Sequence, residues 1–195
     1  MEESDLIINA RRGEEAAWEA LVRQHQEPAF RLAYLILGDA ADAEDVAQEA
    51  FIRALQALER FDTDRPFRPW LLSITANLAR NRRRSIGRYL AAVRRLARGK
   101  PEPVTPAATR DARRWEAEIL WQALRRLSAM DQEVIYLRFF LELSVEETAE
   151  ALGVAPGTVK SRLHRALARL RGVIQREFPI LLKGRYLLRT RRQSS

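Results

Sequence analysis

Apolar residues recur along most of the chain at the three- and four-residue steps of an amphipathic helix. In the clearest case they form one buried stripe of a helix, made of Ala43, Val46, Ala47, Ala50, Phe51, Ala54, Leu55 and Leu58. No stretch alternates apolar and polar residues for long enough to indicate a strand. The pattern therefore predicts an all-α protein.

Glycines, prolines and short acidic residues mark the ends of the predicted helices. The first helix ends at Gly38, and Asp39 and Asp42 are candidate N-caps for the second. Glycines and prolines interrupt any continuous helix between 85 and 110, although 88–98 is compatible with a short one. The predicted helical segments are 14–37, 42–60, 67–84 and, as a second helical unit, 111–176.

These segments form two small helical domains joined by a flexible linker. We divide the chain into 1–86, 87–110, 111–177 and a basic C-terminal tail, 178–195. Two arrangements are compatible with such a linker, since the domains can tumble independently or pack together. The tail, which carries two apolar clusters, can likewise pack on the domains or bind a regulator.

Residues 144–170 predict a helix-turn-helix. Ser144 and Glu147 have the spacing of a capping box, Gly153 suits a left-handed turn, and Pro156 suits the first turn of a helix. With Val159 and its apolar neighbours buried, the outward residues are Thr158, Lys160, Ser161, Arg162, His164, Arg165 and Arg169. Donors concentrated in the first turns of a second helix are typical of recognition in the DNA major groove. The alternative is a solvated basic face on an ordinary bundle helix.

A second polar stripe lies beside the predicted core face of 67–84, which is Leu71, Ile74, Thr75 and Leu78. It consists of Trp70, Ser73, Asn77, Arg80, Asn81 and Arg84. An aromatic ring that stacks, amides that read base edges and arginines that contact phosphates fit the handling of single-stranded DNA. Phe61 and Phe67 flank the preceding loop and are candidates for the same role. The alternative is that Trp70 and both Phe belong to the core, with the arginines on a solvated helix end.

Composition narrows the class of protein. The chain has 195 residues, of which 47% are hydrophobic and 31% charged, as in globular proteins. The absence of Cys excludes disulfides, thiolate metal sites and cysteine nucleophiles, and we predict neither a metal site nor a cofactor. No apolar run reaches the roughly 18 residues that a membrane helix needs. The acidic N-terminus is unlike a secretory signal, so we expect a soluble cytoplasmic protein without membrane insertion.

Charge is distributed unevenly along the chain. Residues 1–60 carry 6 basic and 13 acidic side chains, a net charge of −7, whereas 61–114 carry 14 and 4, and 115–195 carry 14 and 9. Of the 34 basic residues, 31 are Arg, whose planar fork suits phosphates and guanine edges. An acidic segment followed by basic ones indicates a protein partner for the first part and nucleic acid for the rest.

Two sets of segments in this chain resemble domains of one known protein family. The run Asp42–Ala54, the loop Phe61–Arg65, Phe67 and the run Trp70–Asn77 resemble domain two of bacterial extracytoplasmic-function (ECF) sigma factors. Domain four of the same family is similar to Leu124–Leu127, Glu133–Ile135, Ser144–Glu150 and Gly157–Ala166. The resemblance spans about 10–176 in the family's order.

The resemblance implies an alternative sigma factor, a subunit that is not itself an enzyme. Such a protein binds core RNA polymerase, directs it to promoters through the −35 and −10 elements and helps to melt the DNA. The implied contact with the clamp helices of the largest polymerase subunit is at Asp45, Gln48, Glu49, Ile52 and Arg53. Capture of a flipped −10 base is implied at Phe61, Arg65, Phe67, Trp70, Asn77, Arg80, Asn81 and Arg84. Reading of the −35 element is implied at Thr158, Lys160, Ser161, Arg162, His164 and Arg165. The flap of the second-largest subunit, promoter DNA and an anti-sigma factor are the further implied partners.

Two alternative functions can be compared with the motifs in the sequence. A stand-alone helix-turn-helix regulator explains 111–176 but leaves the motif at 42–84 without a role. A metal-dependent hydrolase built on Glu44, Asp45 and Glu49 requires a histidine at ligand spacing, and neither His25 nor His164 lies near them in the sequence. Carboxylates in the first turn of a helix are explained more simply by the helix dipole.

Overall fold

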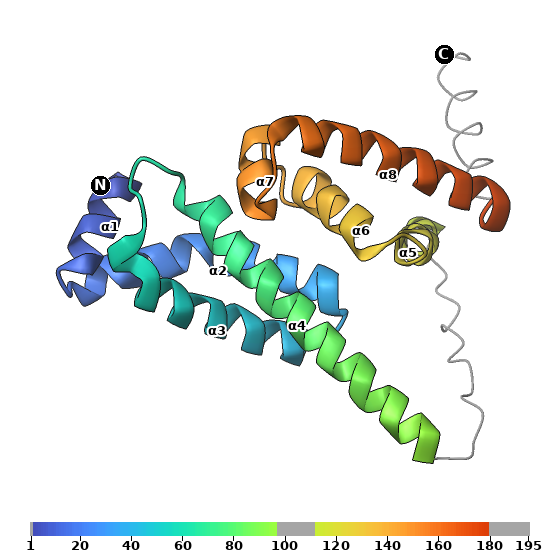
Figure 1. Cartoon of the computed structure of the whole chain (residues 1–195), viewed down its shortest axis with the longest axis horizontal. Coiled ribbons are helices and arrows are strands. Elements are labelled where there is room, and N and C mark those ends of the chain that lie inside the picture. Colours follow the sequence, from blue (N-terminus) through green and yellow to red (C-terminus); the bar gives the residue numbers. More distant parts are fainter. Residues whose placement is uncertain (1, 97–111, 180–195) are drawn as a thin grey trace. The chain divides into compact units, whose positions relative to one another are not determined.

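The computed structural model describes residues 2–96 and 112–179, with side-chain surroundings for 2–91 and 117–179. Within these described ranges the secondary structure is helical and contains no strand, which confirms the all-α prediction (Figure 1). The helices are α1 (Glu3–Arg11), α2 (Glu15–Leu37), α3 (Ala40–Ala57), α4 (Phe67–Leu96), α5 (Ala112–Arg125), α6 (Ala129–Ile135), α7 (Val145–Leu152) and α8 (Pro156–Glu177). A 3-10 helix, η1 (Leu58–Arg60), follows α3, and a π-helix, η2 (Tyr136–Phe140), follows α6.

Contacts divide the chain into two compact units. The first contains α1 to α4 together with Tyr136–Val159, which includes η2 and α7. The second contains α5, α6 and the part of α8 that begins at Lys160. Most residues of the linker and the C-terminal tail predicted from the sequence, 97–110 and 180–195, lie outside the described residues.

The core of the first unit lies where α2, α3 and α4 pack on one another, with α1 against α2 (Figure 1). Leu21, Phe51, Phe67 and Leu71 are among its buried side chains. The helix ends follow the predicted local chemistry. Gly38 closes α2 with a φ of 78°, a left-handed conformation that glycine adopts without strain. Asp39 caps α3, because its Oδ1 accepts a hydrogen bond of 2.9 Å from the Asp42 N–H.

Three details of these helices differ from the prediction. Helix α4 does not end near Arg84 but continues through Gly87 to Leu96. A single glycine costs a helix only about 1 kcal/mol relative to alanine, and the surrounding Arg, Leu and Ala residues are strong helix formers. Helix α1 was not predicted. Leu55, predicted in the buried stripe, is 44% exposed because it lies at the edge of that stripe.

In the second unit, an ion pair joins α8 to the beginning of α6. Arg169 Nη1 donates to both carboxylate oxygens of Asp131, at 2.9 and 2.7 Å. Asp131 is 3% exposed, so the partner that stabilises its charge lies within the protein. Arg169, which the sequence placed on the outward face of the recognition helix, therefore has a structural partner.

Candidate nucleic-acid interface

The outer face of α3 gathers the five residues predicted to contact a protein partner. Asp45, Gln48 and Arg53 are exposed, and Glu49 is half-buried and accepts a hydrogen bond of 2.7 Å from Arg53 Nε. Ile52 lies among them with 53% of its surface exposed. Protein–protein interfaces have an apolar centre and a polar rim, so an exposed isoleucine with polar and charged neighbours is compatible with the predicted contact.

The loop after η1 is closed at its base by an aromatic cluster. Phe61 and Phe67 lie with their ring centres 5.7 Å apart, and Trp70 lies 4.5 Å from Phe61 and 5.4 Å from Phe67. Phe61 is 6% exposed and Phe67 is fully buried, whereas Trp70 is half-buried. The expectation that Phe61 and Phe67 stack on DNA bases is thus corrected. Both rings lie in the core beneath the loop, and Trp70 is the most accessible of the three.

Asparagine and arginine pair along the exposed stripe of α4. Arg80 Nη2 donates to Asn77 Oδ1, and one turn later Arg84 Nη2 donates to Asn81 Oδ1 at 2.5 Å. Because each amide oxygen accepts from a guanidinium, the amide NH₂ groups are oriented to donate. The stripe therefore presents two amide NH₂ groups beside two guanidinium charges. This arrangement is suited to binding base edges next to phosphates.

A third arginine of the same helix is directed to α3 instead. Arg82 Nε and Nη2 donate to Asp42 Oδ1 at 2.8 and 2.5 Å. Asp45 Oδ2 lies 3.7 Å from Arg82 Nη2. The hydrogen bond to Asp42 and the charge of that carboxylate raise the pKa of the Arg82 guanidinium. This pair ties the basic helix to the acidic one. Sequence reasoning did not find it, because the two partners are 40 residues apart.

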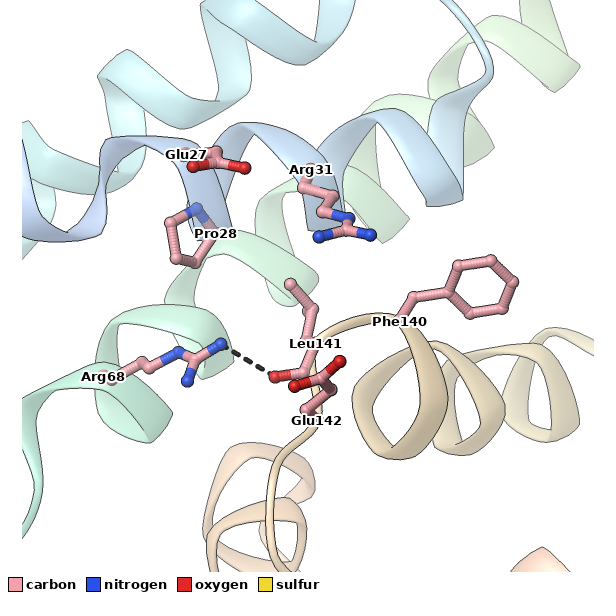
Figure 2. A pocket seen from close by; sticks show the side chains of 7 residues that line it. All are labelled: Glu27, Pro28, Arg31, Arg68, Phe140, Leu141 and Glu142. Carbon is pink, nitrogen blue, oxygen red and sulfur yellow. Dashed lines mark hydrogen bonds between the residues drawn. The ribbon is translucent and has the colours of Figure 1, made fainter.

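Arg65 and its neighbour Arg68 have partners within the first unit. Arg65 Nε donates to Glu150 Oε1 of α7 at 2.9 Å, and Arg68 Nη2 donates to the Leu141 carbonyl at 2.7 Å (Figure 2). The second bond lies at a cavity of about 210 Å³, which is lined by Glu27, Pro28, Arg31, Arg68, Phe140, Leu141 and Glu142. Arg65 is therefore already paired with a carboxylate, although 52% of its side-chain surface is exposed.

The helix-turn-helix segment has the local geometry that its sequence predicts. Ser144 Oγ accepts from the Glu147 N–H at 3.0 Å, while Glu147 Oε2 accepts from the Ser144 N–H at 2.7 Å. This is the complete capping box of α7. Gly153 then ends α7 in the left-handed conformation, with a φ of 65°, and Pro156 is the first residue of α8.

The first half of α8 has an apolar and a polar face. Val159 and Ala166 are fully buried, whereas Lys160, Ser161, His164 and Arg165 are exposed and Thr158 and Arg162 are half-buried. Arg165 Nε donates to the Ser161 carbonyl at 3.2 Å, which directs its guanidinium along the helix towards the N-terminal turns. The exposed donors of this face lie where a recognition helix contacts base edges.

Sequence reasoning assigned no role to α1, yet this helix contacts both ends of the loop that follows η1. Arg11 donates from Nε to the Leu58 carbonyl at 2.9 Å and from Nη2 to the Phe61 carbonyl. At the other end, Glu3 Oε2 accepts from the Phe67 N–H at 3.3 Å. Leu6, Ile7 and Ala10 at three- and four-residue spacing were the signal for this helix, but the segment is short.

Among the described residues, no helix is long and apolar enough to span a membrane. The same part of the chain holds no group of three or more His, Cys, Asp or Glu side chains placed to bind a metal ion.

Comparisons with known proteins identify both halves of this architecture. A family model for Sigma-70 region 2 matches residues 21–89, and one for Sigma-70 region 4 matches residues 117–170. The first match contains α3, the loop and the exposed stripe of α4, and the second contains the helix-turn-helix.

Individual relatives match most of the chain. The ECF RNA polymerase sigma factor SigL of Mycobacterium tuberculosis is 38% identical over 171 residues, which cover 87% of this chain and 95% of SigL. SigW of Bacillus subtilis, another ECF RNA polymerase sigma factor, is 32% identical over 85% of this chain and 92% of its own. The solved structure of CnrH in complex with the cytosolic domain of CnrY has a TM-score of 0.67 and 30% identity, over 90% of this chain and 98% of CnrH. The chain therefore belongs to the ECF family of RNA polymerase sigma factors.

Proposed function

We propose that this chain binds core RNA polymerase, directs it to promoters through their −35 and −10 elements and helps to melt the DNA, without being an enzyme itself. It works in the cytoplasm, where polymerase and promoter DNA meet. The observation that supports this most strongly is that one chain carries both sigma-region matches, each of which contains an exposed polar face with donors or charges.

We assign these binding roles to the segments predicted from the sequence. Segment 1–86 binds the clamp helices of the largest polymerase subunit through α3, and captures a −10 base with the loop and α4. Segment 111–177 reads the −35 element through α8 and contacts the flap of the second-largest subunit. Segment 87–110 links the two, and the tail 178–195 follows them.

An anti-sigma factor is a further proposed partner. CnrH, which resembles this chain over 90% of its length, was solved in complex with the cytosolic domain of CnrY. A protein of this kind would hold the sigma factor away from polymerase until a signal releases it.

The decisive experiment measures binding to core RNA polymerase from a related bacterium by fluorescence anisotropy, with free promoter duplex as the comparison. We expect nanomolar affinity for core and little affinity for the duplex alone. Sequence-specific binding to duplex DNA without binding to core would instead make the chain a stand-alone helix-turn-helix regulator.

Arg165→Ala tests the −35 assignment. If the guanidinium reads a base edge, the variant holoenzyme loses about 1–3 kcal/mol of discrimination at one base pair. The measurement is competition binding of holoenzyme to promoters that differ singly along the −35 element. Arg171→Ala, at an exposed position two turns further along α8, serves as the matched control. Equal losses on every sequence would assign Arg165 to phosphate contact instead.

Asn77→Ala tests the −10 assignment. Removing the amide deletes one donor towards the unpaired strand and the acceptor for Arg80, so open-complex formation on duplex promoters falls while affinity for core is unchanged. Permanganate reactivity of unpaired thymines measures the open complex, and anisotropy measures core binding. Loss of core binding in the variant would refute this role for Asn77.

A further inference from the structure

Helix α1 precedes residues 21–89, the range that matches Sigma-70 region 2. Its apolar face, Leu6, Ile7 and Ala10, is buried in the same cluster as Leu58, Phe61 and Phe67. Phe61 and Phe67 bound the loop 62–66, and Leu58 begins η1, the 3-10 helix before it. Helix α1 thus lies against the base of the loop that we propose captures a −10 base.

One end of the loop is held by Arg11. Its guanidinium donates to the carbonyls of Leu58 and Phe61, which begin and follow η1. The Leu58 carbonyl also accepts a hydrogen bond of 3.1 Å from the Phe61 N–H, which closes η1, so the guanidinium adds a second, charged donor at this helix end. Because one rigid fork contacts both oxygens, the direction in which the chain enters the loop is determined by Arg11.

The other end is held by Glu3. Its Oε2 accepts from the N–H of Phe67, the first residue of α4, and its Oε1 lies 2.8 Å from His25 Nε2 of α2. His25 is buried and its ring lies 5.2 Å from that of Phe67. The hydrogen bond to His25 lowers the pKa of the Glu3 carboxyl, with smaller contributions in the same direction from the His25 charge and the Phe67 N–H. The carboxylate form therefore caps α4.

Between these two anchors the Arg65 side chain pairs with Glu150 of α7, and the backbone of the loop has few constraints. Asp62, Asp64, Arg65 and Pro66 are exposed, and the hydrogen bonds within the loop are a turn from the Arg65 N–H to the Asp62 carbonyl and a bond from the Asp64 N–H to Asp62 Oδ1. The position of the loop backbone relative to α4 thus depends mainly on its ends. A displacement of about 1 Å is enough to weaken recognition of a bound group severely.

We infer that Glu3 and Arg11, which we call the α1 brace, are positioning residues that set base selectivity at the −10 element by fixing both ends of loop 62–66. The inference rests on the proposed function of that loop. Neither side chain is expected to contact DNA or polymerase.

The experiment uses the full chain assembled with core RNA polymerase, and a promoter selected from a randomised library by the wild-type holoenzyme. Selectivity is the ratio of open-complex yields between the selected base and each substituted base at every −10 position. For Arg11→Ala this ratio falls about tenfold at one position, equivalent to one charge-assisted hydrogen bond. Core affinity and −35 discrimination remain unchanged.

Two further variants separate positioning from folding. Arg11→Lys keeps the charge but replaces the planar fork with a single ammonium nitrogen, so its selectivity lies between wild type and Arg11→Ala. Arg12→Ala removes an adjacent exposed arginine and behaves as wild type. Amide hydrogen exchange within 62–67 accelerates in Arg11→Ala and not in Arg12→Ala. If Arg11→Ala does not fold, as judged by its melting temperature, Arg11→Lys decides the question.

Equal selectivity in the Arg11 and Arg12 variants would overturn the inference and leave the proposed function intact. A parallel loss of core affinity and −10 selectivity in Arg11→Lys would also overturn it, because α1 would then serve folding alone. If the wild-type holoenzyme selects no sequence, the proposed function fails first and the inference fails with it.

Discussion

Replacing Phe67 by Ala is expected to lower the free energy of unfolding of the first unit by about 3–5 kcal/mol. The ring is fully buried and contacts three other rings, those of His25, Phe61 and Trp70. Removing it takes away the transfer free energy of the side chain and leaves a cavity that the rigid backbone around it cannot close. A loss of this size lowers the melting temperature by roughly 10 °C.

Calorimetry or urea denaturation of the full chain measures this effect. Tyr89→Ala is the matched control, because Tyr89 is an aromatic residue of the same helix with 70% of its surface exposed, and we expect it to change stability by less than about 0.5 kcal/mol. A Phe67→Ala protein of wild-type stability that had lost promoter melting would instead restore Phe67 to the DNA-contacting set.

Replacing Ile52 by Asp is expected to weaken binding to core RNA polymerase by about thirtyfold or more. Burying an isoleucine in an interface contributes about 2 kcal/mol, which corresponds to about thirtyfold in affinity. The new carboxylate would add the cost of desolvating a charge. Because Ile52 is 53% exposed in the free chain, the substitution removes little packing within α3, and the melting temperature stays close to that of wild type.

Fluorescence anisotropy with core polymerase measures the change. Ile8→Asp is the control, since Ile8 is another exposed isoleucine of the first unit, at 39%, and lies outside the face of α3. Equal affinities for the Ile52 and Ile8 variants would place the polymerase contact on another surface.

Local signals in the sequence were sufficient for much of the fold. The capping box at Ser144, the left-handed Gly153 and the opening Pro156 were predicted because each depends on residues within one turn of the chain. The same reasoning failed at Gly87, where the propensities of the neighbouring residues outweigh one glycine. It also missed α1, whose nine residues are too few for a periodic pattern to stand out and whose stability comes from packing.

The sequence predicted which polar residues of the candidate site are exposed. It did not predict which of the aromatic residues are buried. Asn77, Asn81 and Arg84 lie along one face of α4, as the helical spacing requires. Phe61 and Phe67 could not be placed from spacing, because an aromatic ring beside a loop serves equally as a base-stacking platform or as the core beneath the loop. The contacts of Arg65 with Glu150 and of Arg82 with Asp42 join residues far apart in the chain, so no local pattern contains them.

The pairing of Arg82 with Asp42 has a consequence for how binding to single-stranded DNA depends on ionic strength. Phosphate contacts gain free energy largely by releasing condensed counterions, and each contributes about 0.7 to the slope of log K against log salt on a single strand. A carboxylate already neutralises Arg82 in the free protein, whereas Arg84 is hydrogen-bonded to a neutral amide. Counting every arginine of α4 would therefore overestimate how steeply the affinity for single-stranded DNA falls with salt. The phosphate contact proposed for Arg84 would then depend on cellular salt, whereas Arg82 would contribute little to that dependence.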